Sequence, residues 1–313
     1  KLGYIECGVP QGSVLGPLLF CIFINDLPLH IVNKAVALDL FADDSSLHTS
    51  SSDVKTAQSN LQEELNNVAK WCTCNKMIVH PQKTKSMVIT SRQKHQRAPL
   101  TLNLYLGSDP IEQVSVHKVL GVTIDEELKW SHHINNVTKA VSKNLFLLGK
   151  LRYYLDADAM RMFFHAHCLS HINYVSTVWS NAREVHLKKL NSLHRRAGKL
   201  IVPNPYLSTS EKLQAAKIIP LKQQFQLNTA VLVYKVKHGL APKYIERLLT
   251  SSDNRYGSNK FILPKTRIDL FKTSFAFSGA SVWNTLPVNV QSSGSLCSFK
   301  RNTKKHLFLN CAV

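Results

Sequence analysis

Two short runs of alternating residues, separated by a pair of aspartates, restrict the fold of this chain more than any other feature. In the first run the apolar residues recur at every second position: Val36, Leu38 and Leu40. A period of two is typical of a strand with one buried face, so we expect strands at 35–41 and 45–49 with a turn at 42–44. Asp43 and Asp44 then lie together at the tip of a hairpin, where their like charges repel each other.

The spacing of apolar residues changes further along the chain. From 53 to 72 they recur every three or four residues, which predicts an amphipathic helix behind a Ser/Asp cap. The run from 18 to 27 follows Pro17 and predicts a buried helix. Short alternating runs between 77 and 125 predict four or five further strands. Helices are expected in the rest of the chain around 130–148, 156–177, 183–201 and 221–238.

The charge of this 313-residue chain is unevenly distributed. Its net charge is +19, yet residues 1–125 carry 11 Lys and Arg against 11 Asp and Glu, whereas residues 126–313 carry 28 against 9. A strongly basic half favours a polyanionic partner such as nucleic acid over a surface that is merely solvated. The sequence contains no run of eighteen apolar residues, so no membrane span is expected. Its seven scattered cysteines favour a reduced intracellular chain over a disulfide framework.

Two clusters of residues contain side chains that could bind a metal ion. Adjacent aspartates at a hairpin tip suit hard divalent cations such as Mg²⁺, and two carboxylate-held ions are the usual machinery of in-line phosphoryl transfer. Aspartate is also a common turn residue, so the pair alone leaves a plain turn as an alternative. In "FFHAHCLSH" (163–171), His167 and His171 lie one helical turn apart and allow a zinc site. A helix with packed and exposed histidines is favoured there, because no glutamate or second cysteine completes a ligand set.

Further segments surround the aspartate pair in a fixed order. They are "GVPQGSVLGPLLF" before it, "WCTCNKMIVHPQKTKSMVI" after it, and then "KVLGVTIDEELKWSHHI", "YVSTVW" and "SVWNTLPVNVQ". Together with "FADD" they resemble the reverse transcriptases of non-LTR retrotransposons of the jockey and LINE type, over essentially the whole chain. The resemblance implies an RNA-directed DNA polymerase that uses Mg²⁺ and binds an RNA template, a DNA primer duplex and deoxynucleoside triphosphates.

The resemblance also implies roles for individual residues. Asp43 and Asp44 are the implied metal ligands and catalytic acids, and Lys83 in "PQKT" would steady the leaving pyrophosphate. Without the surrounding match, Lys83 would be interpreted as a solvated loop lysine. Asp39 is expected to be a partly exposed strand residue rather than an extra ligand. Gly121 in "LGV" falls in the hairpin that grips the primer. The residues implied to lie against the nucleotide, the template or the primer end are Pro10, Gln11, Gly12, Ser13, Phe41 and Ala42.

By this resemblance the fold is α+β. A partial right-hand palm, an antiparallel sheet with packed helices, is expected at 1–125, a helical thumb at 126–200 and a basic, α-rich C-terminal region at 201–313. In the family, the other catalytic aspartate and the fingers precede the "GVPQGS" segment. The resemblance therefore suggests a fragment, and we expect this chain alone not to extend a primer. The expected place of action is the nucleus.

The helix at 183–201 is the sharpest candidate for contacts with a nucleic-acid backbone. Its apolar residues are expected to be buried, and five basic residues occupy its other sides: Lys188, Lys189, Arg195, Arg196 and Lys199. Two other functions stay open. A decayed or co-opted remnant would bind nucleic acid without catalysis, although the intact "FADD" and "PQGS" argue against long decay. An RNA-templated RNA polymerase would be expected to carry "GDD" in place of "FADD".

Overall fold

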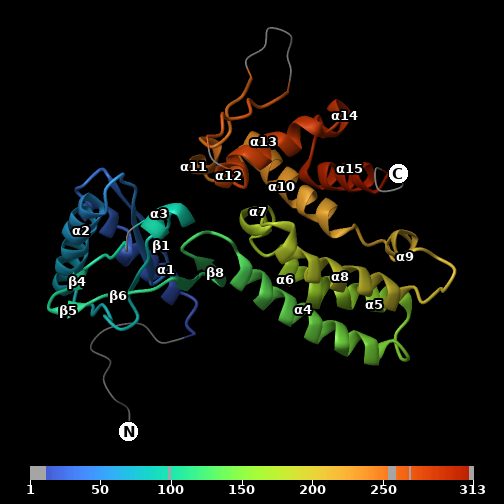
Figure 1. The fold of residues 1–313 in the computed structure, drawn as a ribbon, viewed down its shortest axis with the longest axis horizontal. Coiled ribbons are helices and arrows are strands. Elements are labelled where there is room, and N and C mark those ends of the chain that lie inside the picture. Colours follow the sequence, from blue (N-terminus) through green and yellow to red (C-terminus); the bar gives the residue numbers. More distant parts are fainter. Residues whose placement is uncertain (1–11, 98–99, 253–258, 268, 310–313) are drawn as a thin grey trace. The chain divides into compact units, whose positions relative to one another are not determined.

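The internal contacts of the chain divide it into two compact units (Figure 1). Unit 1 contains residues 1–119 and 124–128, and unit 2 contains residues 120–123 and 129–313. This computed structural model describes residues 12–97, 100–252, 259–267 and 269–309. Helices and short sheets occur together, which is compatible with the expected α+β class. The predicted division into three domains stays a prediction.

The first part of the chain, up to the hairpin that leads into unit 2, contains all the named strands. Its elements are, in chain order, α1 (Gly16–Ile24), the 3₁₀ helix η1 (Leu27–His30), β1 (Val36–Phe41), β2 (Asp44–Thr49), α2 (Val54–Cys74), β3 (Lys85–Ser86), α3 (Arg92–Arg97), β4 (Tyr105–Leu106), β5 (Asp109–Pro110), β6 (Glu112–Gln113), β7 (Val116–Val119) and β8 (Val122–Asp125).

The hairpin of β1 and β2 has the longest strands of unit 1. Its antiparallel register runs from Val36 opposite Thr49 to Phe41 opposite Asp44. The side chains of its inner face pack against Val68 and Trp71 of α2 and against Leu27: Leu38, Leu40 and Leu47. The hairpin is confirmed, but its second strand starts at Asp44, so the turn consists of residues 42 and 43 alone.

A buried carboxylate fixes the segment that enters this hairpin. Glu64 of α2 is completely shielded from solvent. Its Oε1 accepts hydrogen bonds from the backbone N–H groups of Val32 at 3.1 Å and Asn33 at 2.6 Å, and its Oε2 accepts one from Asn67 Nδ2 at 3.1 Å. A carboxylate buried without such donors would be strongly unfavourable. Glu64 therefore ties the start of β1 to α2.

The sheet content after α2 is smaller than the sequence predicts. Residues 77–80 form no strand, and β3 contains two residues that pair in parallel with β6. Met77 and Val79 instead pack with their side chains against the core beneath the hairpin. The alternating pattern reports which side chains are buried, and it does not distinguish a strand ladder from an extended segment that is held by packing.

The apolar run at 18–27 is not the buried helix that we expected. α1 has its proline in the first turn, as predicted. However, Leu18, Leu19 and Ile22 are 58%, 46% and 66% exposed, and in this helix only Gly16 and Ile24 are buried. One side of α1 meets the core around Trp71 and Leu27. Because the run is apolar on all sides, the sequence alone does not show which side is covered.

The helices of unit 2 follow the predicted order. They are α4 (Ser131–Leu151), α5 (Ala157–Phe164), the π-helix η2 (His165–Leu169), α6 (Ser170–Asn173), α7 (Ser176–Trp179), α8 (Glu184–Ile201), α9 (Thr209–Ala215), α10 (Leu221–Lys237), α11 (Lys243–Glu246), α12 (Asp269–Lys272), α13 (Phe275–Thr285), α14 (Val288–Gln291) and α15 (Leu296–Leu309). The predicted apolar stripe of α4 is buried: Ile134, Val137, Val141, Leu145 and Leu148.

Unit 2 has two adjoining regions of core. In one, α4 packs along α8, whose Leu190 and Ala197 are completely buried. In the other, α10, α13 and α15 enclose a stack of aromatic rings, in which the ring of Phe299 lies 4.4 Å from that of Tyr234 and 5.7 Å from that of Trp283. Trp130, Trp179 and Trp283 are all buried, as the packing interpretation of these residues predicts.

The helix expected from 156 to about 177 is interrupted. Asp156 caps its start as predicted, because its carboxylate accepts a hydrogen bond from Ala159 N at 2.7 Å. The backbone then widens into the π-helix η2, and Val175 adopts a left-handed φ of 48° before α7. The π-turn shifts the face on which the following residues lie, and a residue-spacing argument does not anticipate such a shift.

The core of unit 2 contains a histidine without exposed surface, His194 of α8. Its Nε2 lies 2.7 Å from the carbonyl oxygen of Ile219 and therefore carries the proton, while its Nδ1 is buried without a partner among the described residues. Burial lowers the pKa of His194 to about 4, although the bond to Ile219 works in the opposite direction. A second proton would place a charge in a site that offers it no acceptor.

This geometry predicts a stability loss in weak acid. Between pH 6.5 and about 4 the unfolded chain binds a proton at residue 194 and the folded chain does not, so the free energy of unfolding falls by about 3 kcal/mol across this window. His194→Gln keeps a donor for Ile219 but does not titrate, and its stability should fall less. Urea unfolding followed by circular dichroism at several pH values measures both curves. Equal slopes in the two proteins would contradict the assignment.

Candidate functional site

The "FADD" turn is exposed and its backbone is strained. Ala42 and Asp43 form the two-residue turn, and Ala42 has a φ of 52°, in the left-handed region. A residue with a side chain loses about 1–2 kcal/mol in that conformation. The paired strands on both sides of the turn hold it there. Backbone strain of this kind concentrates at functional turns, where it fixes the direction of neighbouring side chains.

The two carboxylates of this turn are free to meet a ligand. Asp43 and Asp44 are both exposed, and among the described residues neither forms an ion pair. The register places Asp44 opposite Phe41, which is 66% exposed, and places Asp39 on the same outer face. Adjacent carboxylate oxygens that point to solvent are the ligand type that Mg²⁺ prefers.

Asp39 has the partner expected of a surface residue. Its Oδ2 lies 3.4 Å from Nδ1 of His48 on β2, and both side chains are mostly exposed. Ion pairs of this kind contribute little to stability. Asp39 thus shares the outer face of the hairpin with Asp44, but the carboxylate of Asp39 pairs with His48.

The "PQGS" segment is described only in part. Pro10 and Gln11 lie outside the described residues. Gly12 has a φ of 85°, a conformation that favours glycine, and a Cβ added to it would meet no described atom within 4 Å outside its chain neighbours. Ser13 Oγ accepts a hydrogen bond from Gly16 N at 3.1 Å, at the start of α1. These contacts keep an exposed glycine backbone next to an ordered helix.

Lys83 lies in an exposed turn. The backbone N–H groups of Lys83 and Thr84 both donate to the carbonyl oxygen of His80 at 3.1 Å. The segment before this turn packs beneath the β1–β2 hairpin through Met77 and Val79. The position of Lys83 is thus fixed by the backbone, while its side chain is exposed and has no ion pair among the described residues.

Gly121 lies in a tight turn that depends on a residue the sequence did not single out. Leu120 and Gly121, between β7 and β8, both have positive φ, 47° and 84°. The hydroxyl of Tyr174 donates to the carbonyl oxygen of Leu120 at 2.6 Å, and a Cβ on Gly121 would lie 3.3 Å from the Tyr174 ring. Tyr174 begins the "YVSTVW" segment, so the motif was a signal even though its role was not foreseen.

The segment around Tyr174 is itself fixed to α10. Asn228 Nδ2 donates to Asn173 Oδ1 at 2.9 Å and to Ser176 Oγ at 2.8 Å, and Trp179 Nε1 donates to the carbonyl oxygen of Tyr174 at 3.0 Å. The turn at Gly121 therefore rests on a hydrogen-bonded network within unit 2.

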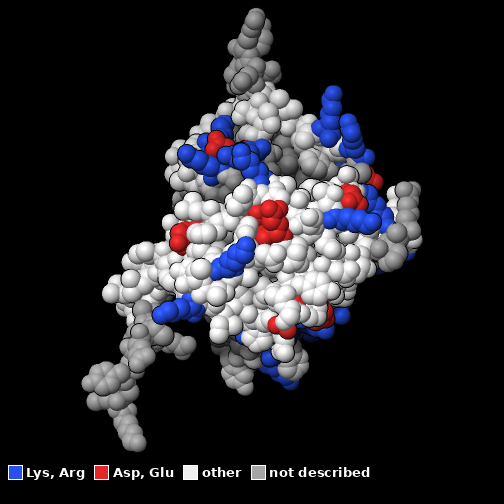
Figure 2. Space-filling view, turned by 90° about the vertical axis from the view of Figure 1, so that its left-hand side faces the viewer, with Lys and Arg blue, Asp and Glu red and all other residues white. Residues whose placement is uncertain are grey.

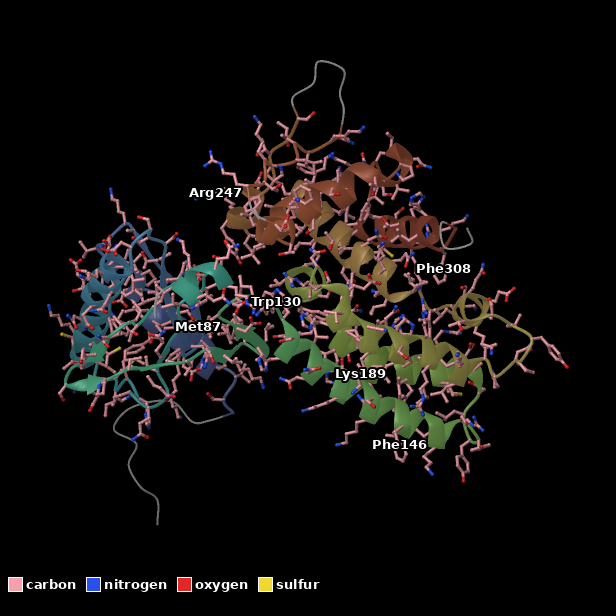
Figure 3. All side chains as sticks on the ribbon, viewed as in Figure 1. Met87, Trp130, Phe146, Lys189, Arg247 and Phe308 are labelled. Carbon is pink, nitrogen blue, oxygen red and sulfur yellow. The ribbon has the colours of Figure 1, made fainter. Side chains whose placement is uncertain are left out.

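The basic residues predicted on the helix at 183–201 share one exposed face of α8. All five are exposed, and among the described residues none has an ion pair: Lys188, Lys189, Arg195, Arg196 and Lys199. At about 100° per residue they fall within roughly 120° of arc, opposite the buried side chains of Leu190 and Ala197. Lys189 is labelled in Figure 3.

Charged side chains form separate groups on the face drawn in Figure 2. The face drawn in Figure 2 shows large uncharged areas with small, separate groups of Lys and Arg and of Asp and Glu. A continuous basic surface does not occur on this face. None of the helices in the described part of the chain is both long and apolar enough to cross a bilayer.

The described residues include no group of three or more His, Cys, Asp or Glu side chains placed to hold a metal ion. In "FFHAHCLSH", Cys168 is completely buried, and burial raises its pKa to about 12. A metal-binding thiolate is not formed in such a site. At the hairpin tip, the carboxylates of Asp43 and Asp44 fit a divalent cation by their chemistry.

Comparisons with known proteins show what the chain is similar to. A family model described as reverse transcriptase (RNA-dependent DNA polymerase) matches residues 2–124. The chain is 32% identical over 213 residues to the probable RNA-directed DNA polymerase from transposon BS of Drosophila melanogaster, a match that covers 64% of the chain and 23% of the relative. It is 27% identical over 253 residues to the polymerase of the mobile element jockey from the same species, covering 78% and 26%.

A third relative is the retrovirus-related Pol polyprotein of a type-1 retrotransposable element R1 from Nasonia vitripennis, 25% identical over 182 residues, with 55% of the chain and 43% of the relative covered. No solved structure matches the chain. The chain spans about a quarter of the length of the first two relatives. Residues 2–124 match the reverse transcriptase family, the RNA-dependent DNA polymerases, and a larger part of the chain is similar to proteins named as polymerases of the transposon BS and the mobile element jockey.

Proposed function

We propose that this chain takes part in RNA-templated DNA synthesis by a non-LTR retrotransposon polymerase, with the β1–β2 hairpin as part of the catalytic centre. One observation carries the proposal. Two adjacent, exposed carboxylates lie at the strained tip of a hairpin whose inner face is firmly packed, within the segment that matches the reverse transcriptase family. Packing holds the backbone of the tip, and exposure leaves its oxygens accessible.

Each residue of the site has a proposed task. Asp43 and Asp44 hold Mg²⁺, which supplies activation of the primer 3′-hydroxyl and charge neutralisation on the phosphates. Phe41 and Ala42 support the primer end. Gln11 and Gly12 meet the incoming nucleotide and the template, where glycine lets backbone approach closely, and Pro10 and Ser13 hold that turn. Lys83 donates to the pyrophosphate that leaves. The turn of Gly121, positioned by Tyr174, contacts the primer strand.

The larger arrangement is part of the same proposal. Residues 1–125 act as part of a right-hand palm, 126–200 as a thumb and 201–313 as a basic C-terminal region. The chain spans about a quarter of the length of its first two relatives. We therefore also propose, for the whole protein, the polymerase activity, its substrates and its action in the nucleus. The exposed basic face of α8 supports a duplex partner, since phosphate contacts give affinity without sequence choice.

A second function has an observation in its favour. Among the described residues, the acidic pair at the hairpin tip is not joined by a third metal-binding side chain. A retroelement-derived protein that binds nucleic acid without catalysis would need only the basic residues of unit 2. Primer extension distinguishes the two functions, because the non-catalytic protein binds the duplex but leaves it unchanged.

The first test is Asp43→Asn in the full-length product of the gene that encodes this chain. Loss of a metal ligand removes stabilisation of transition-state charge, so extension of a DNA primer on an RNA template should fall by about a hundredfold or more. Binding of the duplex should stay largely intact. Extension is measured by gel electrophoresis and binding by fluorescence anisotropy.

Asp39→Asn is the matched control for this test. It removes the same charge four residues earlier, on β1 of the same hairpin, from a side chain that pairs with His48. This control should extend primers nearly as well as the wild-type protein. If Asp43→Asn retains normal extension, or if both variants lose it equally, Asp43 is not a catalytic ligand.

The second test concerns α8. Replacing its five exposed basic residues by Gln should weaken binding of an RNA–DNA hybrid about equally for all sequences. The slope of log K against log salt concentration should become shallower by about 0.9 for each lost phosphate contact. Anisotropy titrations of the whole chain at several salt concentrations provide both quantities.

A variant with the same charge change elsewhere in unit 2 controls for net charge. It replaces five other exposed basic residues by Gln: Lys243, Arg247, Lys260, Lys265 and Arg267. Figure 3 labels Arg247, which follows α11 and is distant in sequence from Lys189. An unchanged slope in the α8 variant would make this helix a merely solvated face, and equal effects in both variants would indicate net charge alone.

A further inference from the structure

A hollow of about 510 Å³ lies between α10 and α15 in unit 2. Leu227, Asn228 and Val231 of α10 line one side of it. The side formed by α15 is strongly basic and carries Cys297, Lys300, Arg301 and Lys304. None of these lining residues is acidic. The hollow therefore combines a partly apolar wall with three cations on one helix.

Lys304 is in an unusual environment for a lysine. It is only partly exposed, and in the described part of the chain no carboxylate forms an ion pair with it. Its pKa is lowered, first by burial and then by the positive charge of Arg161. Its Nζ lies 5.9 Å from the ring of Phe308, which is labelled in Figure 3, so an aromatic face is a neighbour of this ammonium group.

Two more ionisable groups, from a different part of unit 2, interact electrostatically with Lys304. Arg161 of α5 pairs with Asp158 at 2.7 Å. Partial burial, Lys304 and Arg161 together lower the pKa of His165 in η2. The positive charge of Arg161 thus acts on Lys304 of α15, and the carboxylate of Asp158 offsets part of the charge of Arg161.

A cluster of this kind is unfavourable unless an anion joins it. Partial burial raises the free energy of the charged form of Lys304, and the positive charge of Arg161 repels it. A phosphate that enters the hollow would reverse both effects, because it neutralises the cations and accepts their hydrogen bonds in a charge-assisted geometry. The guanidinium of Arg301 is suited to bind a phosphate through two parallel hydrogen bonds.

We propose that the hollow between α10 and α15 is a phosphate-binding site for a nucleic-acid backbone, separate from the basic face of α8. The identity of the ligand rests on the proposed function, in which the chain handles an RNA–DNA duplex. Lys300, Arg301 and Lys304 contact the phosphates, and Arg161 adds positive potential at Lys304. Leu227 and Val231 offer apolar surface to the sugar or base next to the bound phosphate.

The first experiment measures affinity with the whole chain. The triple variant K300Q/R301Q/K304Q should bind a short RNA–DNA hybrid of mixed sequence about tenfold or more weakly than the wild-type protein. Its salt slope should be shallower by about 2 to 3, as expected for up to three lost phosphate contacts. The matched control K243Q/R247Q/K260Q removes the same charge from exposed positions in unit 2 and should have a much smaller effect.

The second experiment needs no substitution and so does not depend on a variant that folds. Cys297 is exposed and lines the hollow, and Cys74 at the end of α2 is an exposed internal reference. Binding of the hybrid should slow the alkylation of Cys297 by iodoacetamide severalfold and leave Cys74 nearly unchanged, as read by mass spectrometry of the digested protein. Unprotected Cys297 at saturating hybrid would overturn the proposal, and so would the absence of any binding.

Two further probes separate the sources of the anion. Protection of Cys297 by polyglutamate but not by the hybrid would assign the hollow to an acidic protein and overturn the nucleic-acid proposal. Protection by inorganic phosphate alone would reduce it to a site for a free anion. If the hybrid protects Cys297 and the gene product never extends a primer, the hollow is supported and the proposed polymerase function fails. Primer extension without protection of Cys297 would overturn the proposed phosphate site and leave the proposed polymerase function intact.

Discussion

The packing of the β1–β2 hairpin on α2 is the contact on which the catalytic hypothesis depends. The tip of the hairpin has no support of its own, since residues 41–44 are all exposed. Its position is set by Leu38 and Leu40, which pack against Trp71, and by the bonds of Glu64 to the backbone before β1. Removal of a buried aromatic side chain such as Trp71 typically costs about 3–5 kcal/mol, so this contact is strong enough to maintain the strained turn at Ala42.

In unit 2, charge and apolar packing are separated. The cores of α4 with α8 and of α10 with α13 and α15 are built from aliphatic and aromatic side chains, and the five cations of α8 are exposed. Exposed cations keep most of their hydration, so a high positive charge costs this unit little while salt is present. Lys304 departs from this pattern because it is partly buried among like charges. A partly buried lysine among like charges indicates the position of an anionic ligand, which the total charge of the unit does not.

The turn at Gly121 illustrates how a site residue depends on a distant segment. Two successive residues with positive φ make a turn that a glycine eases at one position and that Leu120 has to adopt at the other. The hydrogen bond from Tyr174 to Leu120 compensates in part, and Asn173 next to it is bonded to Asn228 of α10. A change in α10 can therefore reach the turn through hydrogen bonds within unit 2, without contact with any substrate.

The sequence by itself determined the elements whose side-chain pattern is strong. The period-two run predicted the hairpin, and the stripe of α4, the cap at Asp156 and the exposed cations of α8 follow from periods and capping chemistry that act within a few residues. The order of the motifs pointed to the family. Only the tertiary structure decided which side of the apolar helix α1 is covered, that 77–80 is held by packing, and that Tyr174 supports the turn of Gly121. These outcomes depend on contacts between residues far apart in the chain, whose free energy a local pattern does not contain.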